Sequence, residues 1–217
     1  MLSLRAYSSS VTLLLVLAAG GARAERGAVS LDVGGGFVAT RQRAPYDTSG
    51  SVVGTEGSVW LGGRVAITNS IELTASLFFD LPATFDVASV GVPTGADTAR
   101  GTLESKVNRK GALVGARYVE GLRWRLIAGG EMGLAQTTFS SQQLYDVTDP
   151  SGPRNYGLVL QDSSRTSLLL APNAGIQWTG DRLSVSFVPR FEYAVGSGRP
   201  SWTVAFPLTV GWDWYVF

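Results

Sequence analysis

Eight stretches of this chain alternate apolar residues with small or polar ones. Successive side chains of a β-strand point to opposite faces, so this alternation predicts strands with one apolar face each. The clearest stretch is 71–81, in which one parity carries Ile71, Leu73, Ala75, Leu77, Phe79 and Leu81, and the other carries Glu72, Thr74, Ser76, Phe78 and Asp80. The same alternation recurs in 29–39, 57–67, 109–118, 122–138, 166–178, 183–194 and 202–217.

Almost all charged residues of these stretches lie on the parity opposite to the apolar one. An arginine that faced lipid near the bilayer midplane would cost about 2–4 kcal/mol, so the bias predicts lipid outside and charges inside. We therefore predict an all-β fold, an eight-stranded antiparallel up-and-down transmembrane β-barrel. The alternative is a soluble lipid-binding barrel with the apolar face inward.

The connections alternate in length. Short turns are predicted at 68–70, 119–121 and 179–182, and longer connections at 41–56, 82–107, 140–164 and, more briefly, 195–201. Barrels of this kind have short periplasmic turns and long extracellular loops, and an even strand count places both termini in the periplasm. Aromatic residues fall near the predicted strand ends, as belts at the two membrane interfaces would require.

The N-terminus has the features of a secretory signal. Arg5 precedes an apolar stretch, 11–19, and the small residues Ala22 and Ala24 predict cleavage before Glu25. A helical anchor is the alternative, but about nine apolar residues cannot span ~30 Å of hydrocarbon. We expect residues 1–24 to be the signal peptide and 25–217 the barrel.

Composition excludes several function classes. The chain has no cysteine, which removes disulfides and thiolate metal sites, and its net charge of +1 gives no reason to expect a nucleic-acid partner. It also has no histidine, the usual general base of outer-membrane hydrolases, so we predict no enzymatic activity and no cofactor. Asp146 and Asp149 provide too few ligands to claim a Ca²⁺ site, so no metal is expected.

The lumen is the candidate functional region. An eight-stranded barrel is only wide enough for side chains to fill it, so buried charges must pair with one another. The predicted lumen charge cluster comprises Asp32, Arg64, Glu72, Arg117, Arg125 and Glu131. Glu72, Arg117 and Arg125 lie near the periplasmic ends of three consecutive strands and are the best candidates for direct contact. Such charges either plug the lumen or line a gated path for small solutes.

The last residues lead to a resemblance. Together with the signal and the eight strands, the terminal Tyr215 and Phe217 make the chain resemble the small eight-stranded outer-membrane β-barrel superfamily of the OmpA transmembrane domain and OmpX. The resemblance implies the outer membrane of a Gram-negative cell, surrounding lipid, a monomer, and Tyr215 with Phe217 as the membrane-insertion signal read by the barrel-insertion machinery.

Two features depart from a regular barrel. Asp213 would face lipid if the phase set by Tyr215 and Phe217 held, which predicts a bulge near 213. Three prolines fall within predicted strands and remove ladder donors, which predicts bulges or broken strands at Pro172, Pro189 and Pro207.

The expected function is therefore a structural or surface-interaction role of a non-enzymatic barrel with a plugged lumen and long extracellular loops. The alternative is a narrow channel for small solutes. The sequence identifies no ligand or loop partner.

Overall fold

The computed structural model describes residues 27–43, 51–94, 97–149, 152–154, 157–195 and 201–215. The expected signal peptide and Phe217 lie outside these residues. The strands are β1 (Ala28–Arg43), β2 (Ser51–Ala66), β3 (Ile71–Thr94), β4 (Asp97–Gly121), β5 (Trp124–Asp149), β6 (Gly152–Arg154), β7 (Leu158–Val159), β8 (Ser163–Thr179), β9 (Leu183–Phe187), β10 (Arg190–Val195) and β11 (Ser201–Tyr215). Within the described part of the chain, no helix is long and apolar enough to cross a membrane.

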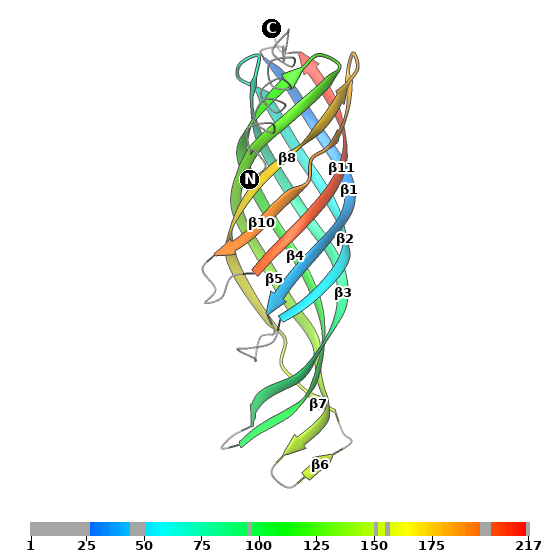
Figure 1. Ribbon diagram of the computed structural model, residues 1–217, viewed down its shortest axis with the longest axis vertical. Coiled ribbons are helices and arrows are strands. Elements are labelled where there is room, and N and C mark those ends of the chain that lie inside the picture. The colour runs from blue at the N-terminus through cyan, green and yellow to red at the C-terminus, as the bar shows by residue number, and fades with distance from the viewer. Residues whose placement is uncertain are drawn as a thin grey trace, which may run out of the picture.

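The strands close into a barrel (Figure 1). β1 pairs with β2 on one side and with β11 on the other, and β8 pairs with β5 and with both β9 and β10. β9 and β10 share one strand position, so the ring has eight positions, all antiparallel. This confirms the predicted fold class.

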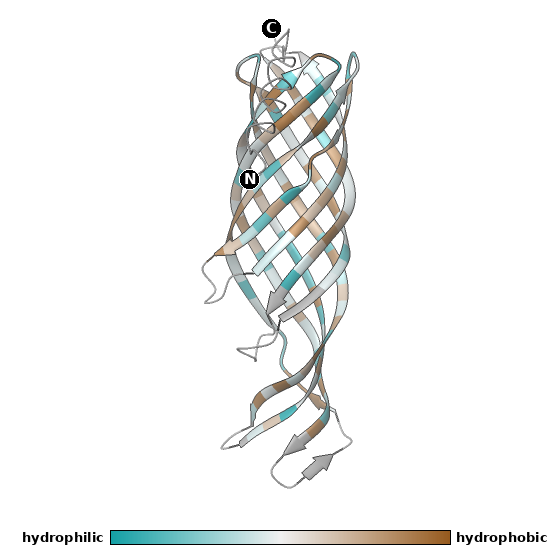
Figure 2. Cartoon of the chain, viewed as in Figure 1, coloured by the Kyte–Doolittle hydropathy of each residue, from teal (hydrophilic) through white to brown (hydrophobic). Residues whose placement is uncertain are grey.

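The outer wall of the barrel is apolar, with many large hydrophobic side chains exposed. Figure 2 shows hydrophobic and hydrophilic residues in turn along the strands. Leu31, Leu73, Leu126 and Leu170 are exposed, while Asp32, Glu72 and Glu131 of the same strands face inward. A lipid-facing surface explains this arrangement, since water would not favour so many exposed leucines. The predicted faces are confirmed, and the alternative of an apolar interior in a soluble barrel is wrong.

Aromatic side chains gather near both ends of the apolar wall. At the end with the short turns, Trp124 pairs with Trp178 across β5 and β8, and both are exposed. Toward the other end, the rings of Phe37 and Phe206 stack at 4.9 Å, and those of Phe191 and Trp202 stack at 6.2 Å. These are the two interfacial belts that the sequence predicted.

Two predicted loops are mostly strand. β3 continues to Thr94 and β4 begins at Asp97, so the expected loop 82–107 is a long hairpin, and β5 occupies much of the expected loop 140–164. We call this extension the arm: 83–94 of β3, 97–107 of β4, 139–149 of β5, and β6 with β7. It lies at the bottom of Figure 1, beyond the ends of β1, β2, β10 and β11.

The sequence analysis did not predict the strands of the arm, because the distribution of apolar and charged residues between the two faces of a strand is reversed there relative to the barrel. Along β4 the inward parity carries charge at Arg117 and Arg109 but apolar side chains at Val107 and Leu103 farther out. The outward parity changes from Val114 to lysine at position 110. Water surrounds the arm where lipid surrounds the barrel, so the apolar face turns inward and forms a second core. This core comprises Val90, Val92, Ala99, Leu103, Leu144 and Val147.

Bulges keep this second core in phase. The pairing of β3 with β4 shifts register between Val87 and Val90, and the pairing of β4 with β5 shifts at two further places. Among the described residues, the non-glycine ones with positive φ lie at these shifts: Ser89, Ser141 and Asp146. Each extra residue returns the following apolar side chain to the inner face.

The predicted irregularities have mixed outcomes. Val188 and Pro189 interrupt the strand between β9 and β10, whereas Pro172 and Pro207 lie inside β8 and β11 without a register shift. The predicted bulge near 213 is wrong, because β11 pairs with β1 in unbroken register to Tyr215 and Asp213 is buried. The predicted turn at 119–121 is also wrong: these residues end β4, and the turn is 122–123.

Candidate functional site: the charged lumen

Every second residue of each barrel strand points into the lumen, which places charges from distant parts of the chain together. We call the end with the short turns (67–70, 122–123 and 180–182) the turn end, and the opposite end the arm end. Both described chain ends lie at the turn end, where Ala28 pairs with Tyr215.

The first ionic centre lies near the turn end around Arg64. Its Nε contacts Asp32 Oδ2 at 2.8 Å, and its Nη2 contacts Asp213 Oδ1 at 3.0 Å. Nη2 also donates to Ser184 Oγ at 2.5 Å, and Ser30 donates its hydroxyl to Asp213. Arg64 is 4% exposed, so these partners compensate the loss of its hydration.

Glu72 and Arg117 form the second pair at this end. Nε and Nη2 of Arg117 lie 2.7 Å and 2.6 Å from Glu72 Oε2. The two residues are direct cross-strand partners on β3 and β4, so the register itself brings them together. Arg125 lies closer to the turn, where its Nε donates to the carbonyl oxygen of Leu122 at 3.2 Å.

The third centre joins Glu131 of β5 with Arg190 of β10. Arg190 Nη1 lies 2.8 Å from Glu131 Oε2, and Thr74 donates to Glu131 Oε1 at 2.9 Å. The guanidinium carbon of Arg190 lies 3.9 Å from the ring centroid of Trp60, a cation–π contact.

The fourth centre lies toward the arm end around Arg109. Its Nε contacts Asp80 Oδ2 at 2.7 Å, and its Nη2 contacts Glu192 Oε2 at 2.6 Å. Nη1 donates to Thr203 Oγ1 at 3.0 Å, and Ser58 donates to Asp80 at 2.6 Å. Both carboxylate side chains are fully buried, and Arg109 contacts both of them. Arg190 Nε lies farther from this centre, 4.0 Å from Glu192 Oε1.

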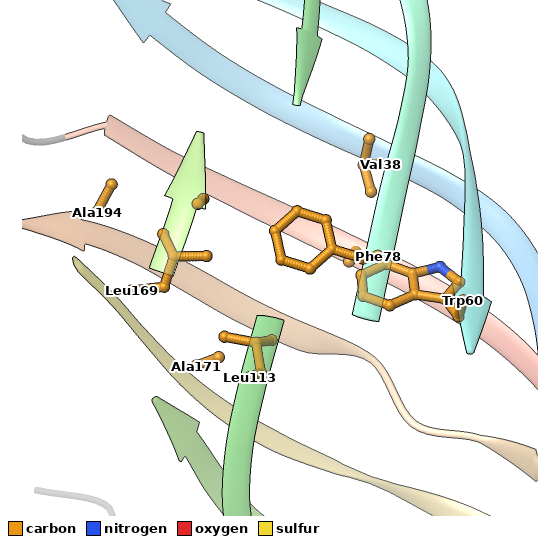
Figure 3. Close-up of a cluster of buried hydrophobic side chains, with 9 residues drawn as sticks. Val38, Trp60, Phe78, Leu113, Leu169, Ala171 and Ala194 are labelled. Carbon is orange, nitrogen blue, oxygen red and sulfur yellow. The ribbon is translucent and has the colours of Figure 1, made fainter. Parts of the chain in front are cut away.

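An apolar cluster crosses the lumen among these centres (Figure 3). Trp60 and Phe78 lie side by side, with ring centroids 5.4 Å apart, and Arg109 stacks over Phe78 at 4.9 Å. Leu113 and Leu169 reach toward them from β4 and β8, and both are 1% exposed. Alanines from β5, β8, β10 and β11 complete the layer: Ala135, Ala171, Ala194 and Ala205.

Two cavities flank the charges on the turn-end side of this cluster. A vestibule of about 670 Å³ at the turn end is lined by Glu72, Arg123, Arg125 and Asp181, among others. A smaller cavity of about 70 Å³ is lined by Asp32, Arg117, Glu131 and Arg190, and reaches Trp60. A volume of this size holds a few water molecules.

The six residues of the predicted lumen cluster belong to separate centres. Asp32 pairs with Arg64, Glu72 with Arg117, and Glu131 with Arg190, whereas Arg125 stands at the vestibule. Sequence reasoning missed the roles of Arg109 and Asp213. Arg109 has the same parity as Arg117 on one strand, which was a usable signal, and Asp213 has the parity opposite to Trp212 and Trp214.

Glu56 was also missed, because it fell in the expected loop 41–56. It belongs to β2, is 7% exposed, and its Oε2 has no hydrogen-bond partner among the described residues. Of the predicted insertion signal, Tyr215 is the last residue of β11, and Phe217 is not described.

Comparison with known proteins identifies the fold. No protein-family model and no curated protein sequence matches the chain. Neisserial surface protein A is 12% identical over 86% of this chain and 99% of its own, with a TM-score of 0.52. Ail of Yersinia pestis, solved with the heparin analogue sucrose octasulfate, is 14% identical over 88% of this chain and 100% of its own, with a TM-score of 0.49. The Neisserial likeness confirms the small outer-membrane β-barrel fold that the sequence resembles.

Proposed function

We propose that this chain is a non-enzymatic, monomeric outer-membrane barrel that conducts no solute and presents the arm as a rigid surface for interaction outside the cell. In this orientation the turn end and both chain ends face the periplasm. Short turns at one end and long extensions at the other support this orientation. The barrel-insertion machinery would read the terminal strand through Tyr215 and Phe217.

The main support for a closed lumen is the apolar cluster together with the arginines that stack on its rings. Trp60 and Phe78 fill the cross-section together with Leu113 and Leu169, and the cavity on their turn-end side shrinks to about 70 Å³. A hydrated ion or solute would have to displace packed side chains and break buried ion pairs to pass. The charges therefore act as structural fillers of the lumen.

The arm supports a role in surface interaction. Its second core holds the three strands in a fixed shape, so it is not a flexible loop. The pairing of β2 with β3 ends at Ser58 and Asp80. Among the described residues, the β2-facing side of β3 therefore has no ladder partner beyond Asp80. Ordered loops on a rigid scaffold commonly carry binding functions.

Planar-bilayer recordings of the purified full-length chain test the closed lumen. We expect no single-channel steps, and reproducible steps from the pure protein would overturn the proposal. The second candidate, a narrow channel for small solutes, is favoured by the vestibule of about 670 Å³, which shares the lining residue Arg64 with the smaller cavity. That candidate predicts steps whose size falls when Arg125 at the vestibule is replaced by glutamine.

A further inference from the structure

The chain contains two lysines and sixteen arginines, and the two lysines lie together. Lys106 and Lys110 are four residues apart on β4, and both are exposed on the outer face. The strand rise places their Cα atoms about 13 Å apart. No other exposed face of the described chain has a lysine.

The lysines mark the border of the apolar wall. Lys110 pairs with Gln136 of β5, and the next outward pair toward the turn end is Ala112 with Leu134. Farther out, Asn108 pairs with Thr138 and Lys106 with Ser140. The first polar residues beyond the apolar wall are thus cationic on β4 and able to form hydrogen bonds on β5. The carboxylates on this face, such as that of Glu104, lie farther from the apolar wall.

No salt bridge joins either lysine to a carboxylate among the described residues. Ammonium groups at a membrane surface attract anionic head groups, each contributing to binding. An ammonium is a compact point charge with three donors, suited to a phosphate oxygen. The position and the free charge together point to a phosphate ligand.

A groove in the outer wall lies on the hydrocarbon side of the lysines. The groove has a volume of about 990 Å³ and runs across neighbouring strands. On β4, β5 and β8 it lies between two rows of outward-facing residues. One row is Val114, Met132 and Leu170, and the other is Ala116, Gly130 and Pro172. On β4, β5 and β8 this second row has no long side chain, and the groove continues over β3 along Leu73 and Ala75. A Cβ added at Gly130 would meet no atom within 4 Å, so space is open there.

The lysines and the groove are in line along one strand. From Lys110 to Val114 the chain advances four residues, or about 13 Å, toward the bilayer centre. An acyl chain that leaves a head group at Lys110 therefore reaches the groove at Val114 and Met132. A free phosphate ion would use the lysines alone and leave the groove empty.

We propose that the outer face of β4, β5 and β8 is a binding site for one phosphate-bearing lipid of the outer leaflet. Lys106 and Lys110 bind the phosphate, Gln136 and Thr138 offer hydrogen bonds to the head group, and the groove at Gly130 holds an acyl chain. This inference rests on the proposed residence in the outer membrane.

Native mass spectrometry of the full chain, released from phosphatidylcholine nanodiscs, tests the site with lipid A as the probe. The phosphate contribution is measured with K106Q/K110Q and, for the wild type, with dephosphorylated lipid A. Two lysines near a charged lipid predict that each of these changes weakens binding by about tenfold or more. Equal binding of lipid A by the wild type and K106Q/K110Q would overturn the proposal.

The groove is tested by Gly130→Leu, whose Cβ enters space with no other protein atom within 4 Å and whose side chain fills part of the groove. We expect binding of lipid A to weaken by about threefold or more. The matched controls are Gly35→Leu, on the outer face of β1 away from the groove, and Arg182→Gln, an exposed cation at the turn end; both should stay within about twofold of the wild type.

Other outcomes identify other occupants. A change in the dimer fraction of Gly130→Leu without a change in lipid binding would assign the groove to a second copy of the chain and overturn the lipid site. Failure of the wild type to enter nanodiscs would overturn the proposed membrane residence instead. Normal entry with no dependence on either lysine would overturn only the lipid site.

Discussion

Ala174 of β8 donates its backbone N–H to the carbonyl oxygen of Pro189 at 3.2 Å, and no N–H returns because proline has none. Residues that face each other in this way in an antiparallel pair normally exchange two bonds. The pair is therefore half formed, at the point where the strand is interrupted between β9 and β10.

Pro172 and Pro207 also face this interruption with a nitrogen that carries no hydrogen. Pro172 is two residues from Ala174 on β8, so its nitrogen faces the same neighbour. On β11 the N–H of Asp213 bonds to Arg182 at the start of β9, and Pro207, six residues away, has the same orientation. Both edges of the β9–β10 strand thus lose donors within a few residues.

We predict that the β9–β10 strand is the least protected barrel strand in hydrogen exchange. Amides near Arg190 should exchange first, since fewer ladder bonds hold them. Pro172→Val restores one donor on a lipid-facing position and should stabilise the strand by about 0.5–1.5 kcal/mol. Pro93→Val in the arm is the matched control and should leave barrel exchange unchanged; uniform protection of all barrel strands would contradict the assignment.

The two faces of β3 predict different responses to arginine. Leu73 faces lipid, so Leu73→Arg should cost about 2–4 kcal/mol and block assembly. Thr74 faces the lumen beside Glu131, so Thr74→Arg should assemble better. Heat-modifiability gels of the membrane fraction measure the folded share, and equal loss in both variants would show that the faces are assigned wrongly.

Arg109 is predicted to be the most sensitive lumen charge. Arg109→Met leaves Asp80 buried without its cation and Glu192 with only Arg190, 4.0 Å away, at a cost of about 3–5 kcal/mol. Neutralising both acids in Arg109→Met/Asp80→Asn/Glu192→Gln should recover most of that loss. Urea unfolding in lipid vesicles provides the measurement, and a triple variant no more stable than the single one would argue against the pairing.

The apolar cluster is predicted to keep the lumen closed. Removing both rings in Trp60→Ala/Phe78→Ala opens space between the smaller cavity and the arm end, so conductance should appear in planar bilayers. Leu169→Val retains a well-packed layer and serves as the control with no conductance. A silent double variant that is folded by heat-modifiability would assign closure to the ion pairs alone.

The arm is predicted to unfold independently of the barrel. Leu144 is fully buried in the second core, and Leu144→Asp removes its apolar contacts and buries a charge there. Arm amides should lose protection in hydrogen exchange, while the barrel keeps its heat-modifiability. The exposed Val159→Asp is the control, expected to leave both unchanged.

The alternation of residues predicted which charged side chains face the lumen, but it did not predict most of the ion pairs that they form. Parity placed Glu72, Arg117 and Arg190 inside, because an arginine facing lipid is costly. The Glu72–Arg117 contact also follows from neighbouring strands in a hairpin. Arg109 and Glu192 are far apart in sequence and meet only across the closed lumen, so no local pattern could show their contact.

The sequence by itself determined which side chains face lipid, how many strands close the ring, and which end has the short turns. Each follows from a period of two in a strand and from the cost of charge in hydrocarbon. Only the tertiary structure showed that the arm is built of strands. In water the apolar side chains of a strand face a core, whereas in lipid they face outward, so the same alternation does not tell the two cases apart. It also decided the partners of Arg64 and Arg109, since ring closure and register bring distant residues together at the barrel axis.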